Sequence, residues 1–545
     1  MNKKFLSFAV GAVALAGVGA FSIMTSGCNK DTESAAEKVY PNTEYITRYM
    51  EARDTIDVKP LATGYAAYFD FSDGVNMAYN DPTSKENLHN IVNAVTTPET
   101  EFYSLGSLEL KPMTGDSEQI FQDIMNPKNY AQQAAPIRKA LQQIIDQNKP
   151  ALLVTDYEEY DGGKIFKGAY AKQYFIEWLK RGYDITFYIV DYKEKGKDKK
   201  LFYTVFDGKD GKLMKKIEAG LNGKPVNYRT FTMGNNNYKI ITDYPSAAKG
   251  GNYHNEKGED DVTTVCENPD EECHYVKMDV YCSEFYPLEE SFQRINRMAA
   301  LKLRGTNRDY PPTVFRYFAQ NLFISTDDLP YKDVKLDINT YSVQDDYEAF
   351  HNHLTAVKAA PTNSNDDPYY EPDGKLKPEF EYSPMPFNEI KDLFVFVNEP
   401  TKIIKGYEEN GGKSHPGYRE VGFTFSEDFN TENKTPVTLN GLTKSYPSDD
   451  LIRVDIVISD VNYLKDTELD DLFKWGNYDN LSESIRLALH EVSPKGKVLY
   501  TYYISPFGTS DTHKDEYDKD FLQNLYPDLD KLYDYYAQSE EDSED

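Results

Sequence analysis

The sequence has little cysteine, histidine and tryptophan, and it is short of basic residues. Its 545 residues include 4 Cys, 8 His and 2 Trp, and 60 Lys and Arg stand against 90 Asp and Glu, a formal net charge of −30. Nucleic-acid binding and attachment through a polybasic surface both need basic faces, so both are disfavoured. A polytopic membrane protein is excluded, because the one long apolar stretch lies at the N-terminus.

Aromatic residues, in contrast, are plentiful. The chain contains 44 Tyr and 29 Phe, and aromatics make up 14 % of it. Disordered chains are poor in aromatics, so most of this chain is expected to fold around apolar cores. At roughly 100–200 residues per domain, the length predicts more than one domain.

The N-terminus has the layout of a secretory signal. Two lysines at positions 3 and 4 precede an apolar stretch over 5–23, and small residues then lead to Cys28. The small residues before this Cys resemble a bacterial lipobox, which implies cleavage before Cys28 and a lipid on its thiol. We therefore predict a lipoprotein signal peptide over 1–27 and a polar tether over 28–58. The alternatives are a transmembrane anchor and an ordinary cleaved signal.

The residues that follow Cys28 indicate where the protein is located. They read Asn29-Lys30-Asp31-Thr32-Glu33 and resemble the acidic surface-export signal of Bacteroidetes lipoproteins. The resemblance implies an outer-membrane lipoprotein that faces the cell surface and reaches the membrane only through the lipid on Cys28. The alternative is that this stretch is no more than a polar tether.

Three further cysteines, Cys266, Cys273 and Cys282, allow at most one disulfide. Cys266 and Cys273 flank an acidic loop and are the candidate pair, since disulfides form outside the cytosol. A zinc site that adds His274 is disfavoured, because the sequence has no CxxC pair and the neighbouring acids are hard ligands. Residues 511–545 are expected to be an acidic tail.

Residues 59–250 alternate strand-like and helix-like segments. Strands are expected over 65–69, 101–105, 151–154, 185–190, 201–206 and 238–241, and helices over 85–96, 117–125, 130–147, 169–180 and 213–221. This alternation predicts an open, parallel-dominated α/β sheet with helices on both faces.

From 251 to 510 the pattern changes to short apolar runs separated by Pro, Gly, Asn and Asp. Strands are expected over 393–397, 420–425, 451–458 and 497–504, and one helix over 289–303. This pattern predicts a β-rich, sandwich-like region of one or two small domains.

Polar residues directly follow two of the predicted strands. The first strand leads into Asp70-Phe71-Ser72-Asp73-Gly74, and the central strand leads into Thr155-Asp156-Tyr157-Glu158. Ligands of open α/β sheets bind beyond the carboxyl ends of the strands, so adjacent strands would place Asp70 and Asp156 at one edge. Carboxylate, hydroxyl and water oxygens suit Mg²⁺. Alternatively, Asp70 and Asp73 are turn and cap residues, and Asp156 is a hydrogen-bonded strand end.

These motifs resemble those of a von Willebrand factor type A domain over roughly residues 59–250. That family has an apolar strand ending in Asp-x-Ser-x-Ser and a later strand ending in Thr-Asp, which build a metal-ion-dependent adhesion site with a loop Thr. Asp70 and Ser72 match the first motif and Asp156 the second, whereas Gly74 stands where the second Ser is expected. The resemblance implies Mg²⁺ (or Mn²⁺ or Ca²⁺) held by Asp70, Ser72 and Asp156, with supporting candidates Asp73, Asn129 (at the place of the loop Thr) and Glu158.

The resemblance also implies a function. A type A-like domain would bind a protein ligand or assemble with partners at the cell surface, with an acidic side chain of the partner completing the metal site. No catalytic residue is expected, since the sequence has no GxSxG, HExxH or Walker motif. The alternatives are a structural subunit with a non-functional site and, less favoured, a metal-dependent hydrolase that activates water. Carbohydrate binding by the many Tyr residues is a weaker expectation.

Overall fold

The computed structural model describes residues 39, 43–54, 60–79, 82–161, 163–221, 228–242, 273–283, 292–302, 322–396, 399–404, 415–425, 437–439, 442–444 and 450–506. The predicted signal peptide, Cys28, the tail over 511–545 and the side chains of the predicted Cys266–Cys273 pair lie outside this description. Among the described helices, none combines the length and the apolarity needed to cross a membrane.

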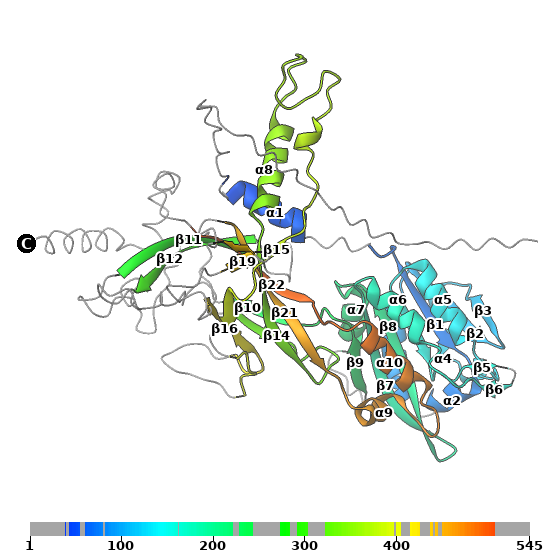
Figure 1. The fold of residues 1–545 in the computed structure, drawn as a ribbon. Coiled ribbons are helices and arrows are strands. Elements are labelled where there is room, and N and C mark those ends of the chain that lie inside the picture. The colour runs from blue at the N-terminus through cyan, green and yellow to red at the C-terminus, as the bar shows by residue number, and fades with distance from the viewer. Residues whose placement is uncertain are drawn as a thin grey trace, which may run out of the picture. The chain divides into compact units, whose positions relative to one another are not determined.

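A seven-stranded sheet organises the first half of the chain (Figure 1), in the order β3-β2-β1-β4-β8-β7-β9. The strands are β1 (Tyr65–Asp70), β2 (Thr100–Gly106), β3 (Glu109–Pro112), β4 (Ala151–Thr155), β7 (Asp184–Glu194), β8 (Lys197–Asp207) and β9 (Arg229–Met233). β1 pairs in parallel with β2 and β4, and the other neighbours are antiparallel. The predicted open α/β sheet is present, but its parallel part is limited to three central strands and the sheet is mixed.

The departure from a parallel sheet comes from the hairpin of β7 and β8. Lys195 and Gly196 connect these strands with φ values of 50° and 79°, as in the two-residue turns that join antiparallel strands. Pairing runs from Glu194–Lys197 at the turn to Asp184–Asp207 at the far end. The polar stretch around the turn therefore extends both strands past the end of β4, where Thr155 pairs with Phe202.

Helices cover both faces of this sheet, as predicted. One face carries α5 (Ile137–Gln147) and α6 (Lys172–Lys180), and the other carries α2 (Asp73–Tyr79), α3 (Pro82–Val95), α4 (Ser117–Met125) and α7 (Lys212–Leu221). Alternation along β1 supplies both cores, since Tyr68 belongs to the first apolar cluster and Ala67 and Phe69 to the second. The predicted helices of this region are confirmed, with bounds that differ by up to seven residues.

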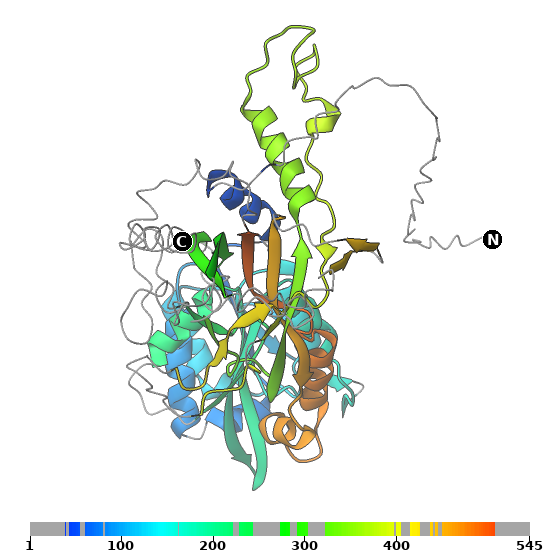
Figure 2. The same ribbon diagram turned by 60° about the vertical axis from the view of Figure 1, so that its left-hand side comes forward.

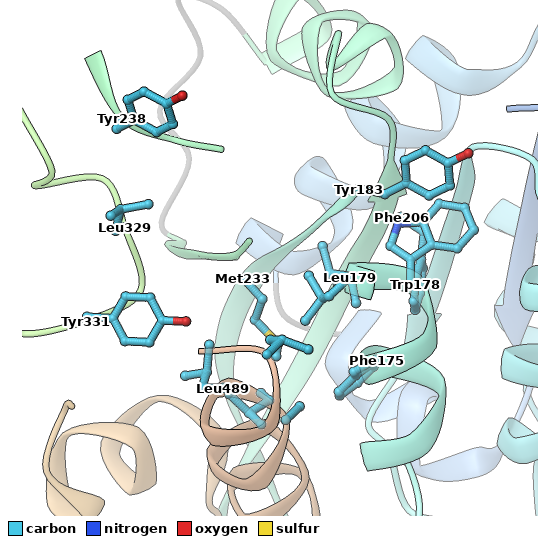
Figure 3. Packing of buried hydrophobic residues seen from close by; sticks show 14 of the residues in the cluster. Phe175, Trp178, Leu179, Tyr183, Phe206, Met233, Tyr238, Leu329, Tyr331 and Leu489 are labelled. Carbon is cyan, nitrogen blue, oxygen red and sulfur yellow. The ribbon is translucent and has the colours of Figure 1, made fainter. Parts of the chain in front are cut away.

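Two helices near the C-terminus complete the α5 and α6 face. They are α9 (Asp466–Phe473) and α10 (Asn480–Glu491). The ring of Phe473 lies 5.2 Å from that of Phe187 and 6.0 Å from that of Phe202, measured between centroids. Leu489 of α10 joins the same apolar cluster, part of which Figure 3 shows. The α/β core is therefore discontinuous in sequence, and the boundary predicted at residue 250 leaves out two of its helices.

The other strands form antiparallel sheets, which confirms the predicted β-rich character. A six-stranded sheet has the order β12-β11-β22-β21-β14-β15, a three-stranded one the order β10-β13-β17, and β16–β18, β19–β20 and β5–β6 are pairs. The bounds are β5 (Tyr160–Asp161), β6 (Lys164–Ile165), β10 (Lys239–Thr242), β11 (Cys273–Ser283), β12 (Phe292–Lys302), β13 (Leu322–Ser325), β14 (Asp333–Ser342), β15 (Asn388–Glu389), β16 (Phe394–Phe396), β17 (Arg419–Val421), β18 (Phe423–Phe425), β19 (Val437–Leu439), β20 (Leu442–Lys444), β21 (Ile452–Asn462) and β22 (Val498–Pro506).

The helix predicted over 289–303 is wrong. Residues 292–302 form strand β12, which pairs along its whole length with β11, from Phe292 opposite Ser283 to Lys302 opposite Cys273. The stretch contains good helix formers such as Met298, Ala299 and Leu301, so intrinsic propensity favours a helix there. Propensity is a weak prior, and pairing with a partner strand overrides it here.

Helix α1 (Thr43–Asp54) lies within the stretch predicted as a tether. It packs beside α8 (Gln344–Lys358), as Figure 2 shows, and the Tyr49 hydroxyl donates to Asp346 Oδ2 at 2.7 Å. At the end of α1, Asp54 forms an ion pair with Arg453 of β21 and accepts a hydrogen bond from the Tyr503 hydroxyl of β22 at 3.0 Å. These residues therefore belong to the folded part of the chain.

Asp184, at the start of β7, is a partly buried acid that faces several charged groups. Its Oδ1 accepts a hydrogen bond from Asn236 Nδ2 at 3.5 Å, and Lys497, Lys209 and Asp207 act on it electrostatically. Burial raises the pKa of Asp184 to about 7, although Lys497 acts to lower it. Burial likewise lowers the pKa of Lys497 to about 8.

A pH dependence of stability follows from Asp184. Because the pKa of Asp184 is higher in the folded state, the contribution of this group to the free energy of unfolding is greatest below pH 3.8, its pKa in the unfolded chain. That contribution is lost as the pH rises towards 7. We expect Asp184→Asn to match wild type at about pH 4 and to be more stable than wild type by about 2 kcal/mol at about pH 7.5. This figure is half of the free energy that the full pKa shift corresponds to, because the group is partly exposed and solvent screens it. Urea unfolding at both pH values tests this. The exposed Asp471→Asn should show no such divergence, and an equal difference at both pH values would contradict the expectation.

Candidate functional site

Two carboxylates meet at the carboxyl edge of β1 and β4, as predicted. Asp70 ends β1 and Asp156 follows β4, and the two strands pair in parallel with Phe69 opposite Val154. Asp70 Oδ1 accepts a hydrogen bond from the Ser72 amide at 2.8 Å, and Asp70 Oδ2 accepts one from the Thr155 hydroxyl at 2.7 Å. Both acids are almost completely buried. Their oxygens therefore face protein donors more than solvent.

The turn after β4 is set by Tyr157, which has a φ of 58°. This left-handed conformation is costly for a residue other than Gly, so the surroundings must hold it. The Tyr157 amide donates to Thr155 Oγ1 at 3.1 Å, and its hydroxyl donates to Thr204 Oγ1 at 2.9 Å. The turn also brings the Glu158 amide to Asp156 Oδ1 at 3.0 Å.

Burial governs the protonation of the two acids. It raises the pKa of Asp70 to about 6, against hydrogen bonds from Ser72 and Thr155 that favour the charged form. It raises the pKa of Asp156 well above its ordinary value, and the negative charges of Glu158 and Asp70 raise it further. Two neighbouring acids in a low-dielectric place disfavour each other's charge.

A lysine from the β7–β8 hairpin reaches this edge. Lys199 Nζ lies 2.8 Å from Glu158 Oε1 and 2.8 Å from Glu194 Oε2. Burial alone would lower the pKa of Lys199, but the charges of Asp156, Glu158 and Glu194 outweigh it and raise the pKa. Glu158 Oε1 also accepts a hydrogen bond from Trp475 Nε1 at 3.1 Å. The site thus contains its own cation.

Sequence reasoning missed Lys199, Glu194 and Trp475. Lys199 and Glu194 lie in a polar stretch that was not expected to continue the strands, and Trp475 lies more than 300 residues after β4. The available signal was that Lys199 continues the alternation of the predicted strand 201–206 backwards. Nothing local to Trp475 indicates its contact with Glu158.

The supporting candidates have different positions. Glu158 contacts the site through its amide on Asp156. Asn129 instead donates from Nδ2 to the carbonyl of Asp123 at 2.8 Å, at the end of α4. Asp73 is exposed at the start of α2, and its amide donates to the Gln132 carbonyl at 2.9 Å. Of the three, only Glu158 has a described contact with the two carboxylates.

The donor set does not fit a divalent metal. Mg²⁺ demands octahedral oxygen ligands, yet both oxygens of Asp70 and one of Asp156 already accept hydrogen bonds. A Cβ on Gly74 would lie 3.0 Å from Asp156 Oδ2 and 3.8 Å from Lys199 Nζ, so the place of the missing second Ser is closed. Within the described ranges, no group of three or more His, Cys, Asp or Glu is arranged to hold a metal ion. Metal binding by Asp70, Ser72 and Asp156 therefore stays a prediction that these contacts do not support.

Comparison with known proteins adds no neighbour to this description. Neither the family models, nor the curated proteins, nor the solved structures include a match to the chain. The geometry of the sheet edge and the N-terminal sequence are therefore the basis for a functional proposal.

Proposed function

We propose that this chain is a surface-exposed outer-membrane lipoprotein that assembles with a protein partner through the carboxyl edge of its type A-like α/β domain. The signal and the lipobox-like Cys28 support the location. The mixed α/β sheet with helices on both faces supports the domain. Ligands of such sheets bind beyond the carboxyl ends of the strands.

The observation that carries the proposal is an exposed leucine in a strained turn at this edge. Ser107 and Leu108 join β2 to β3 with φ values of 49° and 68°, and Leu108 is 56 % exposed. Such turns favour Asn-Gly, and a left-handed leucine costs about 1–2 kcal/mol. The turn lies at the same edge of the sheet as the two carboxylates, because β2 runs parallel to β1 and Leu105 pairs with Asp70 in register.

Three features support contact through this turn over the alternatives. Leu108 is exposed within the described fold, so burial of its side chain does not offset the strain, and residues in rarely populated backbone conformations cluster at functional sites. Lys139 Nζ donates to the Leu108 carbonyl at 2.9 Å, and the Ser107 amide donates to the Ala134 carbonyl at 3.0 Å, so the turn is held in place. A metal-dependent hydrolase would need a metal for which the donor set is unsuited.

Leu108→Asp is expected to lose the partner, whereas Val357→Asp is expected to retain it. Val357 is a matched control, since it is 52 % exposed but lies on α8. A central apolar contact is worth at least about tenfold in affinity. Proteins crosslinked to the full chain in intact cells would be co-purified in detergent and quantified by mass spectrometry for each variant.

Two further arms make this experiment decisive. Cys28→Ala should remove the protein from the outer-membrane fraction. The variant should also be protected from protease that is added to intact cells. Equal partner recovery with Leu108→Asp and wild type would contradict assembly through this edge. Loss of the partner with both Leu108→Asp and Val357→Asp would mean that the partner also contacts parts of the chain outside the α/β domain.

A further inference from the structure

The Lys199 ammonium lies among carboxylates at the edge of β1 and β4. Its Nζ is 2.8 Å from Glu158 Oε1 and 2.8 Å from Glu194 Oε2. A Cβ on Gly74 would lie 3.0 Å from Asp156 Oδ2 and 3.8 Å from this Nζ, so a third carboxylate faces the same small space. The ammonium thus lies in the space next to Asp156 into which the second Ser of the adhesion motif would project.

Strand β8 fixes the lysine in this place. Neighbouring strand residues point to opposite faces, and Lys200 accordingly pairs with Asp191, with Nζ 2.6 Å from Oδ1. Because Phe202 lies opposite Thr155 at the end of β4, Lys199 lies just past that strand. The Lys199 side chain is 12 % exposed, so water screens its ion pairs little.

An ammonium group is suited to neutralising a cluster of carboxylates. It is a compact point charge with three donors, whereas clustered carboxylates without a cation repel one another. We infer that Lys199 is the resident cation of the site, and that it makes the site independent of divalent metal. This inference deepens the proposed function. One consequence of it rests on that function: the partner is bound by direct contacts and not through a shared metal ion.

The test uses thermal unfolding of the full chain with Mg²⁺, Mn²⁺, Ca²⁺ or EDTA. We expect the Tm of wild type to be unchanged by each, and Lys199→Met to lower the Tm by about 5 °C. Divalent cations at about 1 mM, the range of extracellular calcium modules, should restore part of that loss. Sodium chloride of equal ionic strength should restore less, because it screens the repulsion without binding.

Lys200→Met is the matched control, since it removes a neighbouring lysine from an ion pair on the opposite face. It should show no response to cations. A wild-type Tm that rises with a divalent cation, and does so less in Asp70→Ala, would overturn the inference. So would a Lys199→Met protein that is as stable as wild type, or one that is destabilised but indifferent to every cation.

Should Lys199→Met fail to fold, two measurements still decide. Lys199→Arg keeps the charge and should remain folded and indifferent to cations. Equilibrium dialysis of wild type against Mn²⁺ at about 1 mM should show no bound ion, and stoichiometric binding would overturn the inference. None of these readouts involves a partner, so a failure of the Leu108 experiment bears on the proposed function alone.

Discussion

Arg453→Met is expected to lower the free energy of unfolding by about 3–5 kcal/mol, because it leaves two buried carboxylates without their cation. Arg453 Nε lies 2.9 Å and 3.0 Å from the two oxygens of Asp455, and Nη1 contacts Asp54 and the Tyr503 hydroxyl. The three charged residues are 5–6 % exposed. Asp54 belongs to α1, so this network joins the N-terminal helix to two late strands.

The loss should depend on pH. Burial raises the pKa of both Asp54 and Asp455, and Arg453 is the principal group that opposes this. Without Arg453 the acids bind protons more tightly in the folded state, so the deficit should shrink near about pH 5 and grow towards about pH 8. Urea unfolding at both pH values measures it.

Arg486→Met provides the control for Arg453. Arg486 is one-third exposed and forms an ion pair with Glu483 on the same helix, so its loss should cost under about 1 kcal/mol. A deficit of that small size for Arg453→Met, or one that grows as the pH falls, would show that the buried network does not hold α1.

Phe473→Ala is the second large effect, and we expect about 3–5 kcal/mol of destabilisation. Phe473 is completely buried, and its ring packs on Phe187, Phe202 and Phe231, all of which lie in the seven-stranded sheet. Because α9 comes from the C-terminal part of the chain, its truncation opens a cavity in a core built mainly from the N-terminal half. Urea unfolding followed by tryptophan fluorescence reports it.

The adjacent Leu472→Ala serves as the comparison. Leu472 packs at the border of the same cluster and is only partly buried, so its truncation should cost about 1–2 kcal/mol. Equal losses at the two positions would mean that α9 is not seated on the sheet as described. A chain that ends at residue 250 should in turn expose the three rings and aggregate.

Much of the α/β half could be predicted, because its elements carry strong local patterns. The apolar residues of α5 recur at helical spacing, and Ala151 to Val154 form a continuous run typical of a central strand. The meeting of Asp70 and Asp156 follows from the same patterns, since both residues directly follow apolar strands that lie side by side.

What failed depends on contacts between distant segments. β12 has the composition of a helix and becomes a strand only because β11 pairs with it. Lys199 lies in a stretch of mixed charge, and its role appears only when the hairpin returns beside β4. The apolar faces of helices α9 and α10 can be recognised from their sequences, but the sequences do not indicate which sheet these faces cover.

The discontinuous α/β core has a consequence for biosynthesis. The last strand of the seven-stranded sheet ends at Met233, and α10 ends at Glu491, roughly 260 residues later. At a synthesis rate of about 5–20 residues per second, the sheet waits on the order of 10–50 s for the helices that cover its aromatic face. The nascent chain therefore presents an uncovered apolar surface for nearly half of its translation, and such a surface is a target for chaperones.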